Sequence, residues 1–376
     1  MKILQTIAGF GAHSGGTSTC TYDLLTAMHQ QGCDVDLMTV QTSDIMGQGE
    51  SWIKALPDDG ISSYGYSHNI NCYLKESDYD LYHTNGLWMH CNHETCAVAR
   101  QKGKPYIITP HGMLYPQALA RSAWKKKMLL SLGGVDRDLR SAACIHATCK
   151  AEMEYYRQLG YGNPVAVIPN PVPLPDFIND IQRDDQVKRI GFLGRLHPVK
   201  NVESLIDAWI LLGNKVADAQ LVIMGKGDAD YEQMLKDKVA SHGLDNVKFA
   251  GFVTGREKFE RLASLTALCV PSYFENFGMI VTESLSVGSP VIASLGTPWQ
   301  ELETCHCGRW VDNSVKTLAE TIESQLALPL NQINQMGENG KALVAKKYKA
   351  DKVAAMMSSL YDWVQDGGIL PPFVQM

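Results

Sequence analysis

The sequence predicts two doubly wound α/β domains in tandem, each built on a parallel sheet and facing the other across a cleft. Three observations support this fold class. Short apolar runs alternate with segments of helical period through both halves of the chain. The second half begins with the same order of strand, glycine-containing loop and helix as the first. Between the halves lies the densest proline run of the chain, residues 169–175, which is typical of a linker.

The domain boundaries follow from this linker. A chain of 376 residues is too long for one ordinary core, so two domains are expected. We expect an N-terminal domain over residues 1–172, a linker over 173–187 and a C-terminal domain over 188–352. We expect the C-terminal helix and tail, residues 353–376, to return to the N-terminal domain.

Composition indicates a soluble globular protein of the cytoplasm. The hydrophobic fraction is 45% and the charged fraction 20%. The net charge of −6 argues against nucleic acid as a partner, and no apolar stretch reaches membrane-spanning length. The opening residues resemble a strand running into a glycine loop more than a signal peptide. The ten cysteines are scattered, which favours free thiols in a reducing compartment, and the short run Cys305-His306-Cys307 lacks further ligands for a metal.

The first domain opens with a strand, a glycine-rich loop, a helix and a second strand, over residues 2–7, 9–16, 17–31 and 33–40. The loop fits neither the dinucleotide pattern GxGxxG nor a pattern ending in GK[ST]. Two interpretations stay open for Gly15 and Gly16. They form a tight turn, or they let a phosphate or an acceptor approach the backbone closely.

Further strands are predicted along both halves. Residues 44–66 are polar and glycine-rich and are predicted to be a long irregular excursion. The tail from 315 to 363 is predicted to be helical, with breaks near Pro329 and Tyr348. The predicted strands are residues 79–84, 105–109, 143–147, 165–168, 188–193, 219–224, 247–253, 267–270, 290–293 and 309–311.

The chemistry is expected in residues 271–290, a strand–loop–helix segment that carries two acids. Glu275 opens the loop at the carboxyl end of a strand, where open α/β sheets bind ligands. If the helix begins near Phe277, Glu283 lies two turns further on roughly the same side. The backbone N–H groups of Phe277, Gly278 and Met279 would then be free for an anion. Such a site suits ligands that carry both hydroxyl and phosphate groups.

An ordered set of motifs resembles a known family. Residues 275–283, ENFGMIVTE, resemble the acidic signature of retaining nucleotide-sugar glycosyltransferases of the large family four, which have the GT-B fold of two Rossmann-like domains. The resemblance covers nearly the whole chain in family order. Its other parts are Gly15-Gly16, His111, Gly194-Arg195 with Lys200, residues 225–227 and residues 251–253. Residues 111–114 and 120–127 are similar to members that assemble bacterial surface polysaccharides.

The resemblance implies a reaction and a role for each matched residue. It implies transfer of a hexose-type sugar, with retention, from a nucleotide-diphosphate sugar to a glycan or lipid-linked acceptor, without metal or cofactor. The N-terminal domain would serve the acceptor and the C-terminal domain the donor. His111, Glu275, Arg195 and Lys200 are then the expected catalytic residues. The expected donor-binding residues are Gly15, Gly16, Arg195, Lys200, Val253, Glu275, Phe277, Gly278, Met279 and Glu283.

Residue types support part of this assignment. Charge builds on the leaving diphosphate in the transition state, and Arg195 and Lys200 follow a strand at the sheet edge where that charge would lie. The resemblance assigns Glu283 to the ribose hydroxyls and Glu275 to the transferred sugar. On the acceptor side, the candidates that follow strands on the same edge are His13, His83, Asn85, Trp88 and Tyr115, although residues of these types, taken singly, are more often structural.

A basic segment interrupts this acidic protein. Arg121, Lys125, Lys126 and Lys127 are interleaved with Trp124 and nearby apolar residues. Such a helix either lies on an anionic membrane at its cytoplasmic face or is an ordinary solvated helix face. A lipid-linked acceptor would give membrane contact a purpose.

Other functions on the same fold are a sugar-nucleotide epimerase, a phosphorylase-type enzyme and a non-catalytic sugar-nucleotide-binding protein. An epimerase needs no acceptor, and a cofactor-type phosphorylase needs a pyridoxal-binding lysine, whose context is not evident here. A binding module would be expected to have lost one of Arg195, Lys200, Glu275 or Glu283, and all four are present.

Overall fold

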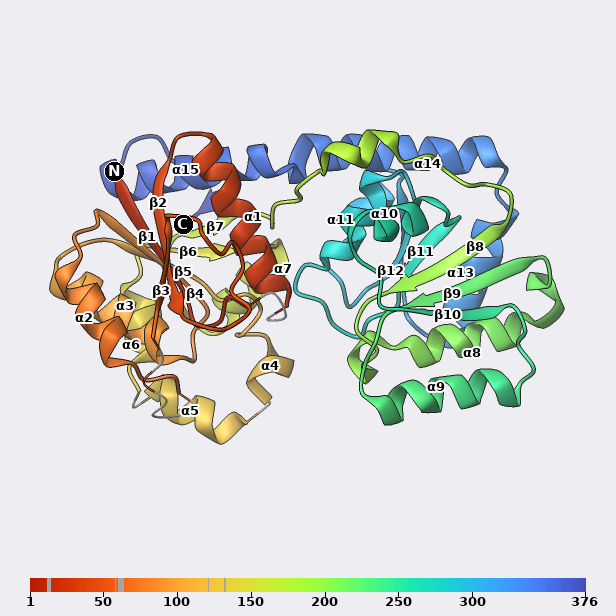
Figure 1. The fold of residues 1–376 in the computed structure, drawn as a ribbon, viewed down its shortest axis with the longest axis horizontal. Coiled ribbons are helices and arrows are strands. Elements are labelled where there is room, and N and C mark those ends of the chain that lie inside the picture. The colour runs from red at the N-terminus through yellow and green to blue at the C-terminus, as the bar shows by residue number, and fades with distance from the viewer. Residues whose placement is uncertain (12–14, 58, 60–63, 121, 132) are drawn as a thin grey trace. The chain divides into compact units, whose positions relative to one another are not determined.

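The computed structural model describes residues 1–376 except 12–14, 58, 60–63, 121 and 132. The chain forms two compact units (Figure 1). The first unit contains Met1–Pro171 together with Ala350–Met376, and the second contains Val172–Lys349. The first unit is therefore built from both ends of the sequence, and the second is a continuous insertion between them.

The first unit is organised on an 8-stranded sheet, counted over the described residues, in the order β14-β7-β6-β5-β4-β1-β2-β3. The strands are parallel except for β14, which runs antiparallel to β7. Since the order reverses between β1 and β4, this is a doubly wound sheet. Its strands are β1 (Lys2–Ile7), β2 (Asp34–Val40), β3 (Ile53–Leu56), β4 (Leu81–Asn85), β5 (Tyr106–Thr109), β6 (Cys144–Ala147), β7 (Val165–Val167) and β14 (Val374–Gln375).

Helices cover both faces of this sheet, each over its own apolar cluster. One cluster joins Leu4, Tyr82 and Ile108 to α3, α6 and α7. The other joins Ile3, Leu81 and Ile107 to α1 and α15. The two clusters use alternate residues of the same strands, as the pleat requires. The helices are α1 (Gly16–Gln30), α2 (His68–Glu76), α3 (His90–Gln101), α4 (Pro116–Ala120), α5 (Ala123–Ser131), α6 (Val135–Ser141), α7 (Lys150–Gln158) and α15 (Ala350–Asp366).

Helix α15 comes from the far end of the chain and packs beside α1 (Figure 1). Met357, Leu360 and Tyr361 are fully buried. The backbone oxygen of Asp351 accepts a hydrogen bond of 2.7 Å from the Gln31 side chain at the end of α1. The C-terminal segment is therefore an integral part of the first unit's core.

The second unit repeats the doubly wound plan. Its 6-stranded sheet, over the described residues, has the order β10-β9-β8-β11-β12-β13 with all pairs parallel. This is the strand order of dinucleotide-binding Rossmann sheets, reversed between β8 and β11. Its strands are β8 (Lys188–Leu193), β9 (Ala219–Met224), β10 (Val247–Gly251), β11 (Ala267–Val270), β12 (Val291–Ser294) and β13 (Gly308–Val311).

Two apolar clusters again fill the faces of this sheet. Trp209 and Leu205 of α8 lie in one, and Val281 and Leu285 of α11 lie in the other. The helices are η1 (Asp176–Asp180), η2 (Pro198–Lys200), α8 (Val202–Leu212), η3 (Gly213–Val216), α9 (Ala229–Ser241), α10 (Gly255–Ala263), α11 (Met279–Ser286), α12 (Glu301–Thr304), α13 (Val315–Ala327), α14 (Leu330–Leu343) and the π-helical turn η4 (Val344–Tyr348).

The prediction of an irregular excursion over residues 44–66 was wrong in part, because β3 lies within it. Strand β3 pairs in parallel with β2 at the sheet edge, with Leu37 beside Ile53 and Val40 beside Leu56. The four residues Ile53–Leu56 are only partly buried and include Lys54, so they lack the continuous apolar run of predicted four-residue strands such as residues 267–270. β14 was missed because it has only two residues. Helix α11 begins at Met279, two residues later than the position considered from the sequence.

Two further findings concern thiols and membrane spans. All ten cysteines are described, and each is a free thiol. In the part of the chain that the structure describes, no helix combines the length and the apolar character needed to cross a membrane.

Candidate functional site

The second unit places two predicted site loops side by side at the point where its strand order reverses. Strand β8 leads into residues 194–200, and its neighbour β11 leads into residues 271–278. Both loops leave the carboxyl ends of their parallel strands, which is where ligands bind in open α/β sheets. Lys200 and Glu275, which are far apart in sequence, meet here.

Lys200 and Glu275 form an ion pair between the Lys200 amine and Oε1 of Glu275. The side chains are 23% and 13% exposed, so the pair is largely shielded from water but reachable. The Ser272 hydroxyl donates a second hydrogen bond of 3.0 Å to the same Oε1. The backbone N–H of Glu275 donates to the oxygen of Gly296 at 2.9 Å. Both the carboxylate and its backbone are therefore held in position.

Asn201 joins the two loops. It adopts a left-handed conformation, with a φ of 55°, at the start of α8. Its side chain is buried and donates a hydrogen bond of 3.2 Å to the backbone oxygen of Pro271. A second link runs from the N–H of Tyr273 to the oxygen of Val199 at 2.9 Å. Because both links cross from one loop to the other, the spacing of Lys200 and Glu275 does not depend on their ion pair alone.

A third loop, residues 225–227, supports the segment that carries Arg195. Leu196 donates its N–H to the oxygen of Lys226 at 2.9 Å. A Cβ atom at Gly227 would lie 2.0 Å from the backbone oxygen of Leu196, so only glycine permits this approach. Arg195 itself is exposed to solvent at the sheet edge. The Gly225-Lys226-Gly227 turn therefore has a structural role, because it holds the backbone next to Arg195, in addition to any contact with a ligand.

The start of α11 lies in the same loop system. Gly278 adopts a left-handed conformation (φ 81°) immediately before the helix. Since α11 begins at Met279, its first N–H groups have no partner within the helix and carry the positive end of its dipole. Phe277 is buried against Trp299, whose indole donates to the Phe277 oxygen. This packing fixes the direction of the helix end.

Glu283 forms an ion pair with a different lysine, Lys258. Its Oε1 lies 2.8 Å from the amine of Lys258 on α10, and each side chain is 21% exposed. Val253 is buried, whereas its neighbour Phe252 is 70% exposed. The two acids of the signature are thus each paired with a lysine, Glu275 with Lys200 and Glu283 with Lys258.

In the first unit, His111 stands in a constrained turn after β5. It has a φ of 51°, which is uncommon for a residue other than glycine, and Gly112 follows with a φ of 75°. The Gly112 N–H donates to the Glu152 carboxylate, which also accepts from the Thr148 N–H at 2.7 Å. Burial raises the pKa of Glu152, and these hydrogen bonds act against that shift. Glu152 thus anchors the backbone next to His111.

The His111 ring is hydrogen-bonded to Asn85, with 3.0 Å between Nε2 and Oδ1. Burial, with a smaller contribution from His146, lowers the pKa of His111 to about 3, so the ring is neutral at physiological pH. Asn85 is itself 7% exposed and donates 2.9 Å to Gln5. The structure therefore brings His111 and Asn85 together and places Asn85 inside a buried polar cluster.

The remaining predicted residues of the first unit have different neighbours. Gly15 has a φ of 93° and precedes α1, which begins at Gly16. Tyr115 is 3% exposed and its hydroxyl lies 3.4 Å from the Cys149 sulfur. Trp88 is half-buried, with the Lys126 amine 5.6 Å above its ring. His13 and Arg121 lie outside the described residues.

Several residues that matter to this geometry were not predicted as site residues. Lys258 reaches Glu283 from α10, and Ser272 reaches Glu275 from three residues earlier in the same loop. Glu152 holds the turn at Gly112 across 40 positions of sequence. For Asn201 alone a signal existed, because an asparagine directly before an apolar helix can adopt a left-handed conformation.

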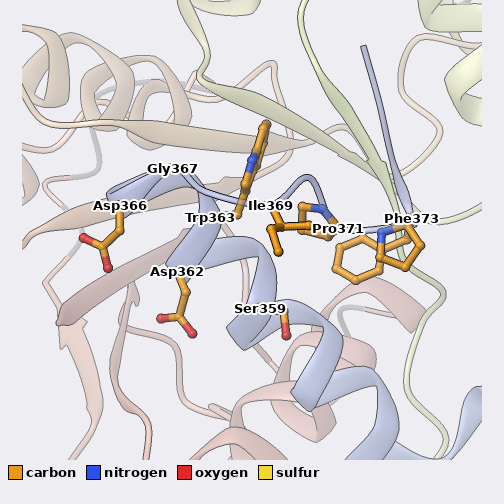
Figure 2. Close-up of a pocket in the computed structure, with 9 residues that line it drawn as sticks. Ser359, Asp362, Trp363, Asp366, Gly367, Ile369, Pro371 and Phe373 are labelled. Atoms are coloured by element: carbon orange, nitrogen blue, oxygen red, sulfur yellow. The ribbon is translucent and has the colours of Figure 1, made fainter.

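A hollow in the first unit lies away from all these residues. Figure 2 shows it between α15 and the segment that follows, with Trp363, Ile369 and Phe373 as apolar neighbours and Asp362 and Asp366 on the helix. None of the predicted site residues lines it. It therefore gives no reason to move the candidate site from the strand ends.

Two family models match adjoining parts of the chain. Residues 14–175 match glycosyltransferase family 4, and residues 175–343 match the glycosyl transferases of group 1. The fold agrees with this match. The Anabaena protein HepE, solved with UDP and glucose, superimposes with a TM-score of 0.75 at 17% identity, over 96% of this chain and 99% of that one. Sucrose-phosphate synthase from Thermosynechococcus elongatus gives 0.74 at 21%, over 98% and 100%.

These structures have the GT-B fold, and so does this chain. It belongs to the glycosyltransferases of family 4 and group 1. Among curated relatives, phosphatidyl-myo-inositol mannosyltransferase of Mycobacterium tuberculosis is 32% identical over 138 residues. The chain spans only 35% of that relative's length. An uncharacterized glycosyltransferase of Methanocaldococcus jannaschii is 30% identical over 193 residues, which is 50% of this chain and 47% of the relative.

Proposed function

We propose that this chain is a retaining glycosyltransferase that moves a hexose-type sugar from a nucleotide-diphosphate donor to a glycan or lipid-linked acceptor. The observation that carries the proposal is the Lys200–Glu275 pair at the strand-order reversal of the second sheet. A cation and a carboxylate at one point suit a ligand that joins an anionic diphosphate to a sugar hydroxyl. Arg195 and the first N–H groups of α11 add positive charge at the same strand ends.

The chemistry would proceed as follows. The bond between the anomeric carbon and the diphosphate oxygen breaks, and Lys200 and Arg195 stabilise the charge that grows on that oxygen. The acceptor hydroxyl forms the new bond on the same face of the sugar, and its proton passes to the leaving phosphate. Glu275 binds hydroxyls of the transferred sugar, and Glu283 binds the ribose. Donor binding therefore exchanges the lysine contacts of both acids for contacts with the ligand.

The wider role that fits this chemistry is the assembly of a bacterial surface polysaccharide, such as lipopolysaccharide, capsule or exopolysaccharide. A structural neighbour that supports this proposal, WaaG, is described as a glycosyltransferase involved in lipopolysaccharide biosynthesis. The M. tuberculosis relative is named for a lipid acceptor, phosphatidyl-myo-inositol. We propose that the acceptor is presented at the cytoplasmic face of a membrane.

The donor nucleotide can be found by thermal unfolding with a panel of UDP-, GDP- and ADP-sugars. HepE was solved with UDP-glucose, and another relative is named GDP-mannose-dependent, so both must be included. A ligand at about a hundred times its dissociation constant stabilises the folded state by about 2.7 kcal/mol, which raises Tm by about 5 °C. Arg195→Ala should reduce that shift. If no nucleotide sugar changes Tm, the proposed donor site is wrong.

Product analysis separates the alternatives. A transferase consumes the donor sugar only when an acceptor is present, and it releases nucleoside diphosphate. An epimerase converts the donor without any acceptor, and a phosphorylase requires inorganic phosphate. A binding protein would raise Tm with the donor and form no product with any acceptor tested.

Activity is expected to survive chelation. Lys200 and Arg195 supply the positive charge that a divalent metal would otherwise bring to the diphosphate. Addition of EDTA to the assayed enzyme should therefore leave kcat within about twofold. Restoration of a fully lost activity by added Mg²⁺ or Mn²⁺ would overturn the metal-independent mechanism.

The surface of α5 supports a contact with anionic membrane. Trp124 and Met128 are 68% and 47% exposed on this helix, and Lys125 and Lys127 are exposed beside them. Lys126 differs, because its amine donates to the Ala118 oxygen within the unit. The Lys125 amine lies 5.6 Å from the centre of the Trp124 ring. The surface therefore combines exposed apolar side chains with two exposed cations, as interfacial helices do.

Neutralising Lys125 and Lys127 to glutamine should weaken sedimentation with anionic vesicles. Each lysine near such a surface contributes about 1 kcal/mol, so the partition should fall about thirtyfold. The matched control is Lys215→Gln with Lys316→Gln, which removes the same charge from exposed positions of the second unit. Equal partition of the two double variants would favour a solvated helix face.

A further inference from the structure

A buried chain of polar side chains runs beneath α15 in the first unit. Gln5, His83, Thr109 and His146 come from four adjacent strands and are all at most 4% exposed. They occupy the sheet face that α15 covers, since Ile3, Leu81, Ile107 and Cys144, two residues earlier on each strand, belong to the α15 cluster. Buried polar side chains need hydrogen-bond partners, and these four occupy neighbouring positions on an otherwise apolar sheet face.

Tyr361 of α15 stands at the centre of this chain. Its hydroxyl accepts a hydrogen bond of 2.7 Å from Gln5 and lies 2.7 Å from Nδ1 of His83. On the other side of the His83 ring, its Nε2 lies 2.6 Å from the Thr109 hydroxyl. That hydroxyl lies 2.8 Å from Nδ1 of His146, whose Nε2 lies 2.8 Å from the backbone oxygen of Ile168.

The backbone oxygen of Ile168 fixes the direction of each hydrogen bond between His146 and Tyr361. A carbonyl oxygen only accepts, so His146 carries its proton on Nε2 and its Nδ1 accepts from Thr109. The Thr109 oxygen therefore accepts from Nε2–H of His83, and Nδ1 of His83 accepts from the Tyr361 hydroxyl. Burial lowers the pKa of His146 to about 4 and that of His83 well below its usual range, so both rings are neutral.

The other half runs from Tyr361 to His111 and requires the same direction. The Asn85 amide nitrogen lies 3.4 Å from the backbone oxygen of Thr6, another group that only accepts, and it also donates 2.9 Å to Oε1 of Gln5. The Gln5 amide nitrogen consequently donates to Tyr361. The Asn85 oxygen is then left to accept from Nε2–H of His111. Anchored at both ends by backbone carbonyls, the chain has one consistent arrangement.

We propose that Tyr361 is a positioning residue that, through Gln5 and Asn85, holds His111 as the Nε2–H tautomer with its Nδ1 lone pair presented to a hydroxyl of a sugar substrate. The identification of the ligand as a sugar substrate rests on the proposed transferase function. The tautomer does not, because it follows from the hydrogen bonds alone. His111 is then an acceptor of a hydrogen bond from the ligand and donates none from Nδ1.

The first test is the nitrogen NMR spectrum of histidine-labelled protein. His111 is assigned as the resonance lost in His111→Gln, and His83 and His146 in the same way. We expect all three rings to show the Nε2–H pattern and to stay unprotonated between about pH 5 and 8. An Nδ1–H pattern for His111, or its protonation near the ordinary histidine pKa, would overturn the proposal whether or not the protein transfers sugar.

The second test is Tyr361→Phe, which removes the hydroxyl between Gln5 and His83 and keeps the ring. The Gln5 amide then loses its acceptor, and only the longer contact of 3.4 Å with the Thr6 oxygen still orients Asn85, so His111 should show a mixture of the two tautomers and kcat/KM should fall about tenfold. Tyr82→Phe, which removes a buried hydroxyl outside the chain from the neighbouring position on β4, is the control and should change neither. Gln5→Met breaks the same link from the other side, in case Tyr361→Phe does not fold.

The outcomes separate the positioning role of Tyr361 from the proposed transferase function. A single Nε2–H pattern of His111 in both Tyr361→Phe and Gln5→Met, with kcat/KM unchanged, would overturn the positioning role. If both variants lose the single Nε2–H pattern of His111, but the unaltered protein transfers no sugar from any donor, the positioning role is supported and the proposed function is contradicted.

Discussion

Lys200→Ala is expected to lower kcat about a hundredfold, since it removes a fixed cation from the leaving diphosphate. It also leaves the Glu275 carboxylate, which is 13% exposed, without its ion-pair partner. Donor affinity should fall less than kcat, because the charge on the leaving group is larger in the transition state than in the bound donor. Steady-state kinetics with the donor identified by thermal unfolding measures both quantities.

The chain contains a matched control for this variant. Lys215 and Glu323 form an ion pair of 2.9 Å in the same unit, but with side chains 62% and 44% exposed. Lys215→Ala should leave kcat unchanged, because an exposed pair contributes about 1 kcal/mol or less to stability and lies outside the loops of the site. Equal kinetics for Lys200→Ala and Lys215→Ala would remove Lys200 from the mechanism.

Glu275→Gln is expected to lower sugar transfer about a hundredfold while nucleoside diphosphate still binds. Glutamine keeps the shape of the side chain and one acceptor oxygen, but it loses the charge that orients Lys200 and accepts the sugar hydroxyls. Calorimetry with the nucleoside diphosphate and kinetics with the sugar donor measure the two effects separately. Glu323→Gln is the control.

The opposite result would be equally informative. If Glu275→Gln abolished binding of the nucleoside diphosphate and transferred bound sugar at the normal rate, Glu275 would belong to the nucleotide and not to the sugar. The double variant Lys200→Ala with Glu275→Gln adds a further check. Since the two side chains touch, its loss should be smaller than the product of the single losses.

Local patterns were sufficient to predict most of the strands. The runs at residues 188–193, 219–224 and 267–270 became β8, β9 and β11 with the predicted bounds. Apolar runs bounded by glycine and proline carry this information within a few residues of each strand. β3 was missed because its four residues are only partly buried and include Lys54, and β14 because it has two residues. What makes both of them strands is the neighbour with which they pair.

The sequence singles out the acids and cations of the candidate site but not the other residues that contact them. Glu275 and Lys200 are charged residues in the loops that follow apolar strands, and they meet because those strands, β11 and β8, are neighbours in the sheet. Lys258 lies on a helix with other charged residues, and nothing in its surroundings indicates that it reaches Glu283. The polar chain could not be predicted either, because its members Gln5, His83 and Thr109 come from three strands and are joined through Tyr361 and His146, which lie elsewhere in the sequence.

The discontinuous first unit has a consequence for the order in which the protein folds during synthesis. Val353, Met357 and Leu360 of α15 complete the core over α1 and β1, yet they are translated only after all of Val172–Lys349. At about 5–20 residues per second, the sheet face beneath α15 stays uncovered for on the order of ten seconds while the second unit emerges. The inserted unit can close its own core during that interval. We therefore expect nascent chains that end before Ala350 to show a protease-resistant second unit and a first unit that binds chaperones.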